Sequence, residues 1–478
     1  MNSADFHNTT HGESCDGQLA EEVQDEAGEK PEAESGQPAP AGQQPAPAGQ
    51  QPAPSPAPEA DNRPSKILVM HASVGSGHRA AAEAIAHALR DQIASGDKLV
   101  DDQPDDIEVE VLDSLDFARF YIDGNKTASG FVGPTRPFYD VFWRYFFTGR
   151  ILWHGGKQWL RVMFPKFAHW VRDNKPAAIV CTHITAANIA VGARCKVKSD
   201  FPIICVPTDY EVEGQWPHHY TDLFCAANGY MAETLRARRI PDHRILVTGI
   251  PVNPSFSHEH DRAQARARWG FDDNTKVALV LAGAKLPKPY LRLRETLDNL
   301  MPHLGNFPDM KFVFVAGSDE EYAAHLRRNV ELEGLGNVEV MGYVDDMPEL
   351  MAACDFTICK AGGLTVTECL CARCPMVLVG KAYGQEKANV RMLTSRGSAM
   401  HVQTWRELLE TIYYIDKDET MLDSLMRNVE RVRLPNAARD IAQATIEMAY
   451  SPVREEDSKR RTSYHFLVGI GDKPAHTR

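Results

Sequence analysis

The stretch that decides the fold is DFTICKAGGLTVTE, residues 355–368. The apolar run at 356–359 has the length of a buried parallel strand, and Gly362 and Gly363 after it mark the start of a helix. Glycine lets the backbone come close to a phosphate, while the unpaired N–H groups and the dipole of a helix start attract its charge. The stretch therefore predicts a phosphate-binding turn between a strand and a helix.

The first turns of that helix add side chains suited to a nucleotide. Leu364 and Thr365 complete the turn, and Glu368 follows about one and a half turns into the helix. A carboxylate at this place can accept hydrogen bonds from vicinal hydroxyls such as those of a ribose. We therefore predict a nucleoside diphosphate ligand. The alternative is a glycine turn capped by threonine, with Glu368 in solvent.

Further polar residues follow the next predicted strand, at 375–379. The motif GQEKAN, residues 384–389, places Gln385 and Glu386 just beyond the carboxyl end of that strand. Open parallel sheets bind their ligands at the carboxyl ends of the strands. This position favours a binding site over a solvated turn.

Composition excludes some classes of function. The chain has 478 residues, of which 43% are hydrophobic, enough for two or three domains. Residues 1–65 hold 12 Asp and Glu against Lys30 and Arg63, so they carry −10 of the net charge of −13. The remainder is nearly neutral, whereas a dedicated nucleic-acid binder needs a basic surface. We expect no nucleic-acid partner.

The ends of the chain and its cysteines give further expectations. Residues 1–64 are acidic and then rich in Pro, Ala and Gln, which predicts a disordered tail. No long apolar run or signal pattern occurs, and most of the ten cysteines lie in apolar runs, so we expect an intracellular protein without a membrane span. Cys369, Cys371 and Cys374 form C-x-C-x-x-C without a second pair or a histidine nearby, and we predict no metal site.

A second glycine-rich turn lies near the start of the folded region. A predicted strand at 66–70 leads into HASVGSGH, residues 71–78, and then into an alanine-rich helix at 79–93. The glycines resemble a dinucleotide fingerprint, but the next strand's terminal acid, Asp113, lies 36 residues after Gly77, and the fingerprint expects about 20. We therefore discount NAD. His78 at the helix start would face the cleft and suits general-base work, although a histidine in a cap is more often structural.

The segment at 131–170 has an unusual composition. It contains 13 Phe, Trp and Tyr residues, and residues 130–172 hold seven Lys or Arg against one acid, Asp140. Aromatic side chains interleaved with cations suit the headgroup region of an anionic membrane. Phe142, Trp143 and Arg144 lie in the first half of this segment. The alternative is that the aromatic residues are helix core and the cations are solvated.

Short apolar strands alternate with helices throughout the rest of the chain, which predicts two doubly wound parallel sheets facing one cleft. Polar pairs follow two of the strands, Thr182-His183 and Thr208-Asp209. The expected limits are 65–252 for an N-terminal domain, 253–435 for a C-terminal domain, 436–452 for a crossover helix and 453–478 for a C-terminal tail. The fold class is thus α/β.

Several motifs in register resemble a known family. SGHRAA at 76–81, KAGGLTVTE at 360–368 and GQEKAN at 384–389 look like the diacylglycerol glycosyltransferases and monogalactosyldiacylglycerol synthases, relatives of the lipid-intermediate GlcNAc transferase of peptidoglycan synthesis. Thr182-His183, Thr208-Asp209 and the segment GIPV at 249–252 also fall in family order. The resemblance covers residues 66–448.

The resemblance implies a GT-B fold, a UDP-sugar donor in the C-terminal domain, a diacylglycerol-type acceptor in the N-terminal domain, inversion at the anomeric carbon, and no metal cofactor. By analogy Glu368 would hold the ribose, residues 362–365 the diphosphate, and Gln385 with Glu386 the sugar hydroxyls. His78 or Asp209 would take the proton of the acceptor. Gly77, Phe142, Trp143 and Arg144 would contact the acceptor. The protein would be cytoplasmic and attached peripherally to the inner face of the cell membrane.

The chain departs from the family pattern at two places. The family usually has several glycines where this chain has LAGAK, residues 281–285; only Gly283 remains here, and Lys285 would contribute charge instead. At the second place, Glu213 stands where many members have histidine. Rival functions are a UDP-sugar epimerase, a non-catalytic UDP-sugar sensor and a GlcNAc transferase acting on a peptidoglycan lipid intermediate.

Overall fold

Short apolar segments form two parallel six-stranded sheets. The computed structural model describes residues 64–74, 76–119, 164–283 and 291–462. The sheet of the N-terminal domain has the order β2-β1-β3-β4-β5-β6, with β1 (Lys66–His71), β2 (Glu108–Asp113), β3 (Ala178–Cys181), β4 (Ile203–Cys205), β5 (Leu223–Ala226) and β6 (Ile245–Val247). The sheet of the C-terminal domain has the order β12-β11-β10-β7-β8-β9, with β7 (Lys276–Leu281), β8 (Met310–Val315), β9 (Val338–Met341), β10 (Phe356–Cys359), β11 (Met376–Val379) and β12 (Ala399–Val402).

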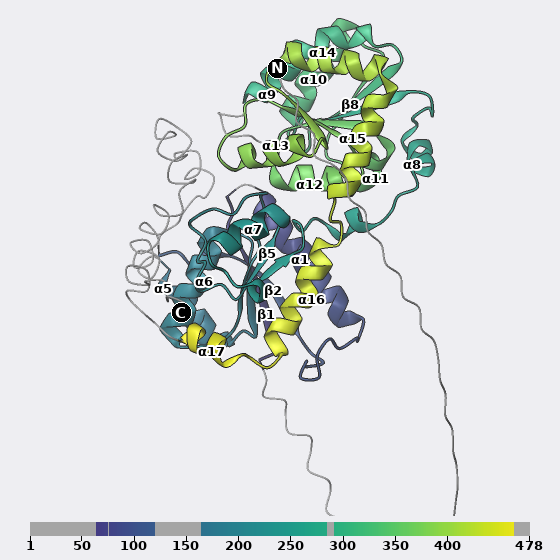
Figure 1. Cartoon of the computed structure of the whole chain (residues 1–478). Helices are drawn as coiled ribbons and strands as arrows, with labels where there is room; N and C mark the ends of the chain where they lie inside the picture. The colour runs from purple at the N-terminus through teal and green to yellow at the C-terminus, as the bar shows by residue number, and fades with distance from the viewer. Residues whose placement is uncertain (1–63, 75, 120–163, 284–290, 463–478) are drawn as a thin grey trace, which may run out of the picture. The chain divides into compact units, whose positions relative to one another are not determined.

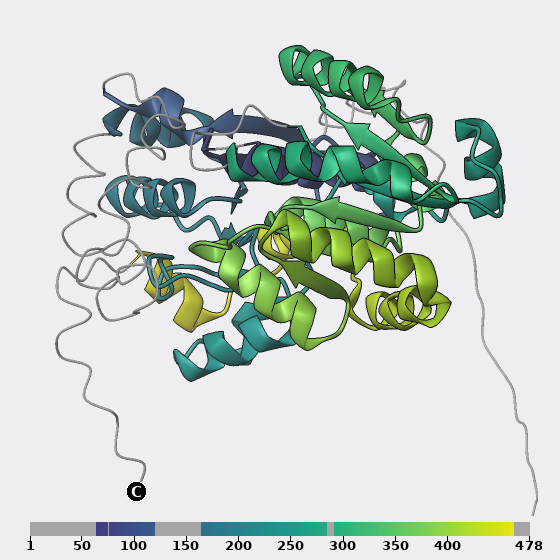
Figure 2. The same ribbon diagram turned by 90° about the horizontal axis from the view of Figure 1, so that it is seen from above.

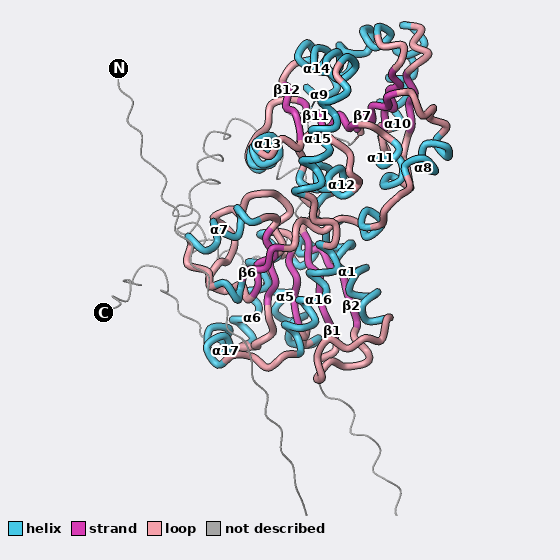
Figure 3. The backbone as a smooth tube through the Cα atoms, turned by 45° about the vertical axis from the view of Figure 1, so that its right-hand side comes forward, coloured by secondary structure: helices cyan, strands magenta, loops and turns pink. Residues whose placement is uncertain are grey.

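Helices connect the strands in both domains (Figures 1 and 3). Those before β7 are α1 (Gly77–Ala94), α5 (Pro165–Asn174), α6 (Ile184–Val197), α7 (Gly229–Ala237) and α8 (Arg262–Trp269). Those after β7 are α9 (Leu291–Leu300), α10 (Glu320–Glu333), α11 (Met347–Ala353), α12 (Gly363–Cys371), α13 (Gln385–Ser395), α14 (Trp405–Lys417), α15 (Glu419–Val432), α16 (Ala437–Tyr450) and α17 (Glu455–Thr462). Short 3-10 turns include η2 (Asp242–Arg244).

Helices lie on both faces of the sheets (Figures 1 and 2). Alternating residues of the central strands pack against the two opposite helix layers. In β1, Ile67 and Val69 pack with α1 and α16, whereas Leu68 and Met70 pack with α5 and α6. Strands buried on both faces need apolar side chains in both directions, which explains the unbroken apolar runs of the sequence. The helix α16 comes from the end of the chain and yet covers the first sheet beside α1.

The strand orders place the ligand-binding crevice of each sheet. In the N-terminal domain, β2 pairs with one edge of β1 and β3 pairs with the other edge. The strand order therefore reverses between β1 and β3. The C-terminal domain reverses between β7 and β10. Ligands of open parallel sheets bind outside the carboxyl ends of the strands at such reversals. The crevices therefore lie beside His78 and Thr182-His183 in one sheet, and beside Gly283 and Gly362 in the other.

The predicted fold class, two doubly wound parallel sheets, is confirmed by these strand orders. The strand β12 and the helices α14, α15 and α17 were not expected. Within the part of the chain that the model describes, no helix combines the length and apolarity needed to cross a bilayer. Residues 455–462 of the predicted C-terminal tail form α17. The rest of that tail from residue 463, residues 1–63 of the predicted N-terminal tail and most of the segment at 131–170 lie outside the described residues.

Candidate active site

His78 stands in the first turn of α1, beside the end of β3. Its Nδ1 lies 3.0 Å from the carbonyl oxygen of Thr182 and 2.9 Å from Oγ1 of Thr208. A carbonyl oxygen can only accept, so Nδ1 carries the hydrogen and Nε2 carries the lone pair. Thr182 also donates from Oγ1 to the carbonyl oxygen of His78 at 2.8 Å, which fixes the helix start. The ring is therefore held in the tautomer that a general base requires.

Burial supports the same state of this ring. Removal from water lowers the pKa of His78 to about 4, while its bond to the Thr182 carbonyl opposes the shift and the charge of His71 adds to it. At neutral pH the imidazole is uncharged and able to accept a proton. His183, the next residue after Thr182, packs its ring edge-on against His78, with 4.5 Å between the ring centroids.

Asp209 lies where the N-terminal domain meets the C-terminal domain. Asn389 of α13 donates from Nδ2 to Asp209 Oδ1 at 2.9 Å and to the carbonyl oxygen of Ala361 at 2.9 Å. Oδ1 of Asn389 accepts from the backbone N–H of Tyr210 at 2.9 Å. Burial raises the pKa of Asp209 to about 6, opposed by the Asn389 bond and assisted by the charge of Glu386. Asp209 is thus engaged in a contact between domains and lies near the predicted sugar-binding carboxylate.

Asn389 itself was quoted in a motif but was not predicted as a site residue. It is fully buried and saturated by the three bonds described above. Its signal was present in the sequence, because Asn389 lies one helical turn beyond Gln385 and asparagine is a poor helix former. Tyr210 strengthens the same contact, since its hydroxyl lies 2.9 Å from Oγ1 of Thr367.

Gly363 is required by this contact between domains. A Cβ at Gly363 would lie 2.0 Å from the carbonyl oxygen of Thr208, far inside van der Waals distance. A Cβ at Gly362 would meet only Thr365 Oγ1, at 3.9 Å. The two glycines of the predicted phosphate-binding turn therefore differ. Gly363 makes room for the other domain, and Gly362 leaves open space at the helix start.

We predict that Gly363→Ala destabilises the protein, because the added methyl forces the two domains apart at Thr208. Overpacking of this kind costs about 1–3 kcal/mol, which thermal or urea unfolding would measure. Gly362→Ala is the matched control and should leave the free energy of unfolding nearly unchanged while weakening UDP binding. Equal stability of the two variants would contradict this interpretation of Gly363.

The remaining residues of the predicted diphosphate site lie around the same helix start. Gly362 is the N-cap of α12, and Leu364 and Thr365 are partly buried in its first turn. Gly77 lies close by, since a Cβ there would come within 3.7 Å of Leu364 Cδ1. The N-termini of α1 and α12 thus approach each other across the two domains.

Gly283 follows β7 at the reversal of the second sheet. A Cβ at Gly283 would lie 2.2 Å from the carbonyl oxygen of Ala316, so packing against the neighbouring loop alone requires glycine. Its presence is therefore no independent sign of a diphosphate. Lys285 lies outside the described residues, as do Phe142, Trp143 and Arg144.

Glu368 is partly buried on α12. Burial alone raises the pKa of its carboxyl to about 7. Among the described residues, none forms a hydrogen bond or an ion pair with this carboxylate. A desolvated acid without a protein partner costs free energy, which hydroxyl donors of a ligand would offset.

Gln385 and Glu386 open α13, as the motif predicted. Glu386 Oε1 pairs with Lys360 Nζ at 3.1 Å. Glu386 and Lys360 line a pocket at the carboxyl ends of β10, β11 and β12, together with Gly380, Lys381, Tyr383 and His401, whereas Gln385 is not among its lining residues. The polar groups of this pocket can hold a sugar through its hydroxyls.

Glu213, the residue that departs from the family pattern, is buried. Its Oε2 accepts from Trp216 Nε1 at 2.5 Å. Burial raises the pKa of Glu213 to about 8, with the charge of Asp209 as the next cause. At neutral pH it is mostly a neutral acid in the wall behind Asp209.

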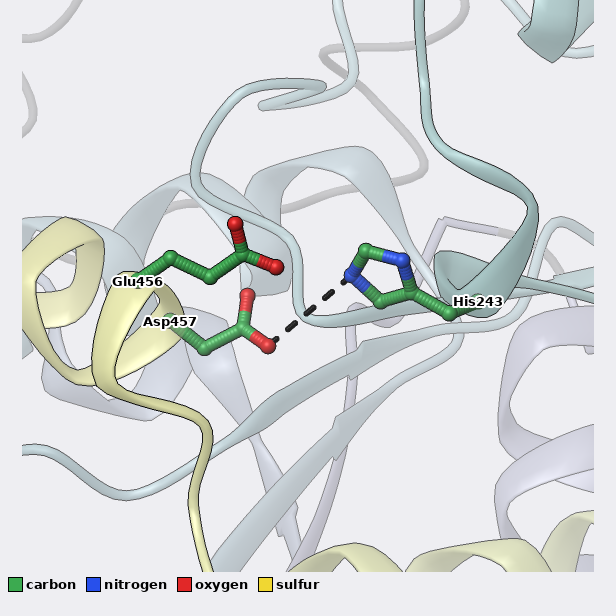
Figure 4. A group of neighbouring side chains, drawn as sticks. All are labelled: His243, Glu456 and Asp457. Carbon is green, nitrogen blue, oxygen red and sulfur yellow. Dashed lines mark ion pairs between the residues drawn. The ribbon is translucent and has the colours of Figure 1, made fainter.

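The predicted absence of a metal site concerned Cys369, Cys371 and Cys374, which are buried in the core around α12. In the described parts of the chain, one group of three metal-type ligands lies close together: His243, Glu456 and Asp457 (Figure 4). It lies between η2 and the first turn of α17. Asp457 is already paired with Arg460 at 2.9 Å, and the positive end of the α17 dipole lies beside it. Arg460 and Arg461 pair with Asp222 at 2.6 and 2.8 Å, and these ion pairs anchor α17 beside the start of β5.

Two family models match the chain. The model for monogalactosyldiacylglycerol (MGDG) synthase matches residues 78–252, which include His78 and Asp209. The model for the C-terminal domain of glycosyltransferase family 28 matches residues 292–443, which include Gly362, Glu368 and Gln385. Each model falls on one of the two parallel sheets and its helices.

Curated relatives agree with these models. The chain is 26% identical over 262 residues to a processive diacylglycerol beta-glucosyltransferase of Bacillus licheniformis, covering 55% of this chain and 67% of the relative. It is 22% identical over 384 residues to the enzyme of the same name from Staphylococcus carnosus, covering 77% of this chain and 89% of the relative. In the Bacillus relatives the match spans about two thirds of the protein's length.

A solved structure shares the fold. The UDP-GlcNAc 2-epimerase of Neisseria meningitidis bound to UDP-GlcNAc superposes with a TM-score of 0.50 at 14% identity, over 79% of this chain and 99% of that chain. At this identity the likeness concerns the fold alone. The two family models, by contrast, fall on the segments that carry most of the motif residues. The chain thus resembles the MGDG synthases in residues 78–252 and the C-terminal domain of glycosyltransferase family 28 in residues 292–443, and its two doubly wound sheets have the GT-B fold class that the sequence predicted.

Proposed function

We propose that the protein is an inverting glycosyltransferase that moves a hexose from a UDP-sugar to the hydroxyl of a diacylglycerol-type lipid. One observation carries the proposal. The imidazole of His78, whose Nε2 carries a lone pair, and the carboxylate of Glu368, which has no partner among the described residues, lie at the strand-order reversals of the two sheets. The first suits removal of a proton from an acceptor hydroxyl, and the second suits a ribose. The relatives are named for transfer to diacylglycerol.

On the donor side, the diphosphate would lie against the N-terminus of α12 at Gly362. The leaving UDP gains negative charge as the glycosidic bond breaks, and helix N–H groups stabilise it. We propose that these groups act in place of a metal ion. Glu368 would accept hydrogen bonds from the ribose hydroxyls, while Gln385 and Glu386 would bind the hexose.

On the acceptor side, Nε2 of His78 would take the proton of the lipid hydroxyl as its oxygen attacks the anomeric carbon. Attack from the face opposite UDP inverts the configuration. Asp209 would act differently, because Asn389 already binds its carboxylate. We propose that it orients the hexose from the acceptor domain.

Membrane attachment completes the proposal, because the lipid acceptor resides in a bilayer. The cations and aromatic residues of the segment at 131–170 suit an anionic headgroup surface. The protein would then work peripherally at the inner face of the cell membrane. Cosedimentation with vesicles of anionic and of zwitterionic lipid would test this part.

UDP affinity should depend on pH through Glu368. Burial raises the pKa of this carboxyl to about 7, and only the ionised form accepts two ribose hydroxyls. Affinity should therefore rise with pH, by about tenfold between pH 6 and pH 8, as titration calorimetry would measure. UDP itself titrates near this range, so Glu368→Gln is the control. A pH dependence as steep in that variant would contradict the assignment.

The function itself is tested by UDP release from a panel of UDP-sugars, with and without diacylglycerol in mixed micelles. Release that requires both a hexose donor and the lipid would support the proposal and identify the sugar. A changed sugar without UDP release would favour an epimerase. Transfer only from UDP-GlcNAc to a polyprenyl-linked acceptor would favour the peptidoglycan precursor reaction.

A further inference from the structure

His183 is a second imidazole at the acceptor crevice, and the mechanism above leaves it unused. It follows β3 directly and is the N-cap of α6, so it stands at the reversal of the first sheet opposite the start of α1. Its ring packs edge-on against that of His78, with an angle of 78° between the ring planes. The two histidines thus reach the same crevice from neighbouring strands.

The hydrogen bonds of the two rings fix opposite tautomers. Nδ1 of His183 accepts from the backbone N–H of Thr185 at 3.1 Å, so Nδ1 carries the lone pair and Nε2 carries the hydrogen. In His78 the hydrogen is on Nδ1, which faces the carbonyl oxygen of Thr182. Burial keeps both rings neutral, because it lowers the pKa of His183 well below its usual value as well. One ring therefore offers an acceptor at Nε2 and the other a donor.

The Nε2–H of His183 bonds to no other described residue. A donor held in a crevice without a protein partner is available to a ligand oxygen. A hydrogen bond from this Nε2–H to the attacking hydroxyl oxygen would lower the nucleophilicity of that oxygen. The donor therefore suits another oxygen of the same acceptor. In a diacylglycerol, the ester oxygens lie a few bonds from the free hydroxyl. A simple long-chain alcohol has no second oxygen.

We propose that His183 is an acceptor-binding residue whose Nε2–H donates a hydrogen bond to an ester oxygen of the lipid, while His78 receives the hydroxyl proton. This inference rests on the proposed function and deepens it. Through this hydrogen bond, His183 would make the enzyme select acyl glycerols over lipids that lack the ester carbonyl. His183 transfers no proton in this role, and its tautomer is unchanged after the reaction.

His183→Ser tests the proposal, because serine retains the helix cap but is too short to reach the acceptor. The matched control is Asn228→Ser, which changes the cap of α7 in the same domain. Both variants should keep wild-type UDP affinity and closely similar thermal stability. His183→Ser alone should raise the KM for diacylglycerol about tenfold and abolish the preference for the diester over the matching diether. Retention of that preference would overturn the proposal.

A second measurement is independent of activity. The ¹⁵N chemical shifts of the two imidazoles report which nitrogen carries the hydrogen, and we expect Nε2 for His183 and Nδ1 for His78. Hydrogen on Nδ1 of His183 would overturn the proposal. If the wild-type protein glycosylates no lipid, the proposed function fails, while these shifts still decide whether His183 presents a donor to the crevice.

Discussion

Replacing His78 by alanine should lower kcat for transfer to the lipid by about 10²–10⁴-fold, the range that a positioned general base contributes. The expectation follows from its tautomer, because Nδ1 faces the Thr182 carbonyl and leaves Nε2 as the base. UDP affinity should be unchanged, since no donor contact is assigned to this side chain. Burial lowers the pKa of His78 to about 4, so the wild-type rate should not fall with this group until the pH approaches that value.

His87→Ala is the matched control for this variant. His87 lies on the same helix but is exposed and paired with Asp91 at 2.8 Å. Its replacement should leave transfer near the wild-type rate. Transfer at an undiminished rate by His78→Ala would remove the base from the mechanism, and Asp209 would then become the candidate.

Replacing Glu368 by alanine should weaken UDP binding by about 100-fold. Two hydroxyl bonds to a carboxylate are lost, and each hydrogen bond to a charged group contributes about 1.5–3 kcal/mol net of its exchange with water, so the lower end of the range for two bonds corresponds to about 100-fold. The variant should fold at least as well as the wild type, because it removes a buried acid that has no partner among the described residues. Titration calorimetry with UDP measures the affinity, and urea unfolding measures the stability.

Glu331→Gln on α10 serves as the control, since Glu331 is an exposed acid on a different helix and belongs to none of the motifs. It should bind UDP like the wild type. If Glu368→Ala retained wild-type affinity, the ribose assignment would be wrong and Glu368 would be a structural acid of α12.

The sequence predicted the central strands and glycine turns well because their signals are local. An apolar run such as 356–359 predicts that its own residues are buried, and the glycines that follow it predict the turn. The strand β12 was missed because His401 interrupts its short apolar pattern. Helices α14 and α15 lacked a motif that would have drawn attention to them.

Contacts between distant segments escaped prediction for a different reason. Asn389 forms hydrogen bonds with Tyr210 and Asp209, which lie 179 and 180 residues away in the sequence. No local pattern around Asn389 predicts these partners. Gly363 was read as making room for phosphate, whereas in the structure Thr208 occupies the space of its Cβ. The opposite tautomers of His78 and His183 depend on backbone partners that only the fold supplies.

The measurement that tests the central claim most directly is the anomeric configuration of the glycolipid formed from a defined α-linked UDP-hexose and diacylglycerol, read by NMR of the purified product. Direct attack by an oxygen deprotonated by His78 predicts a β-linked product in the wild type, formed about 10²–10⁴-fold more slowly in His78→Ala. An α-linked product would contradict single displacement, and with it the assignment of His78 as the base of an inverting transfer.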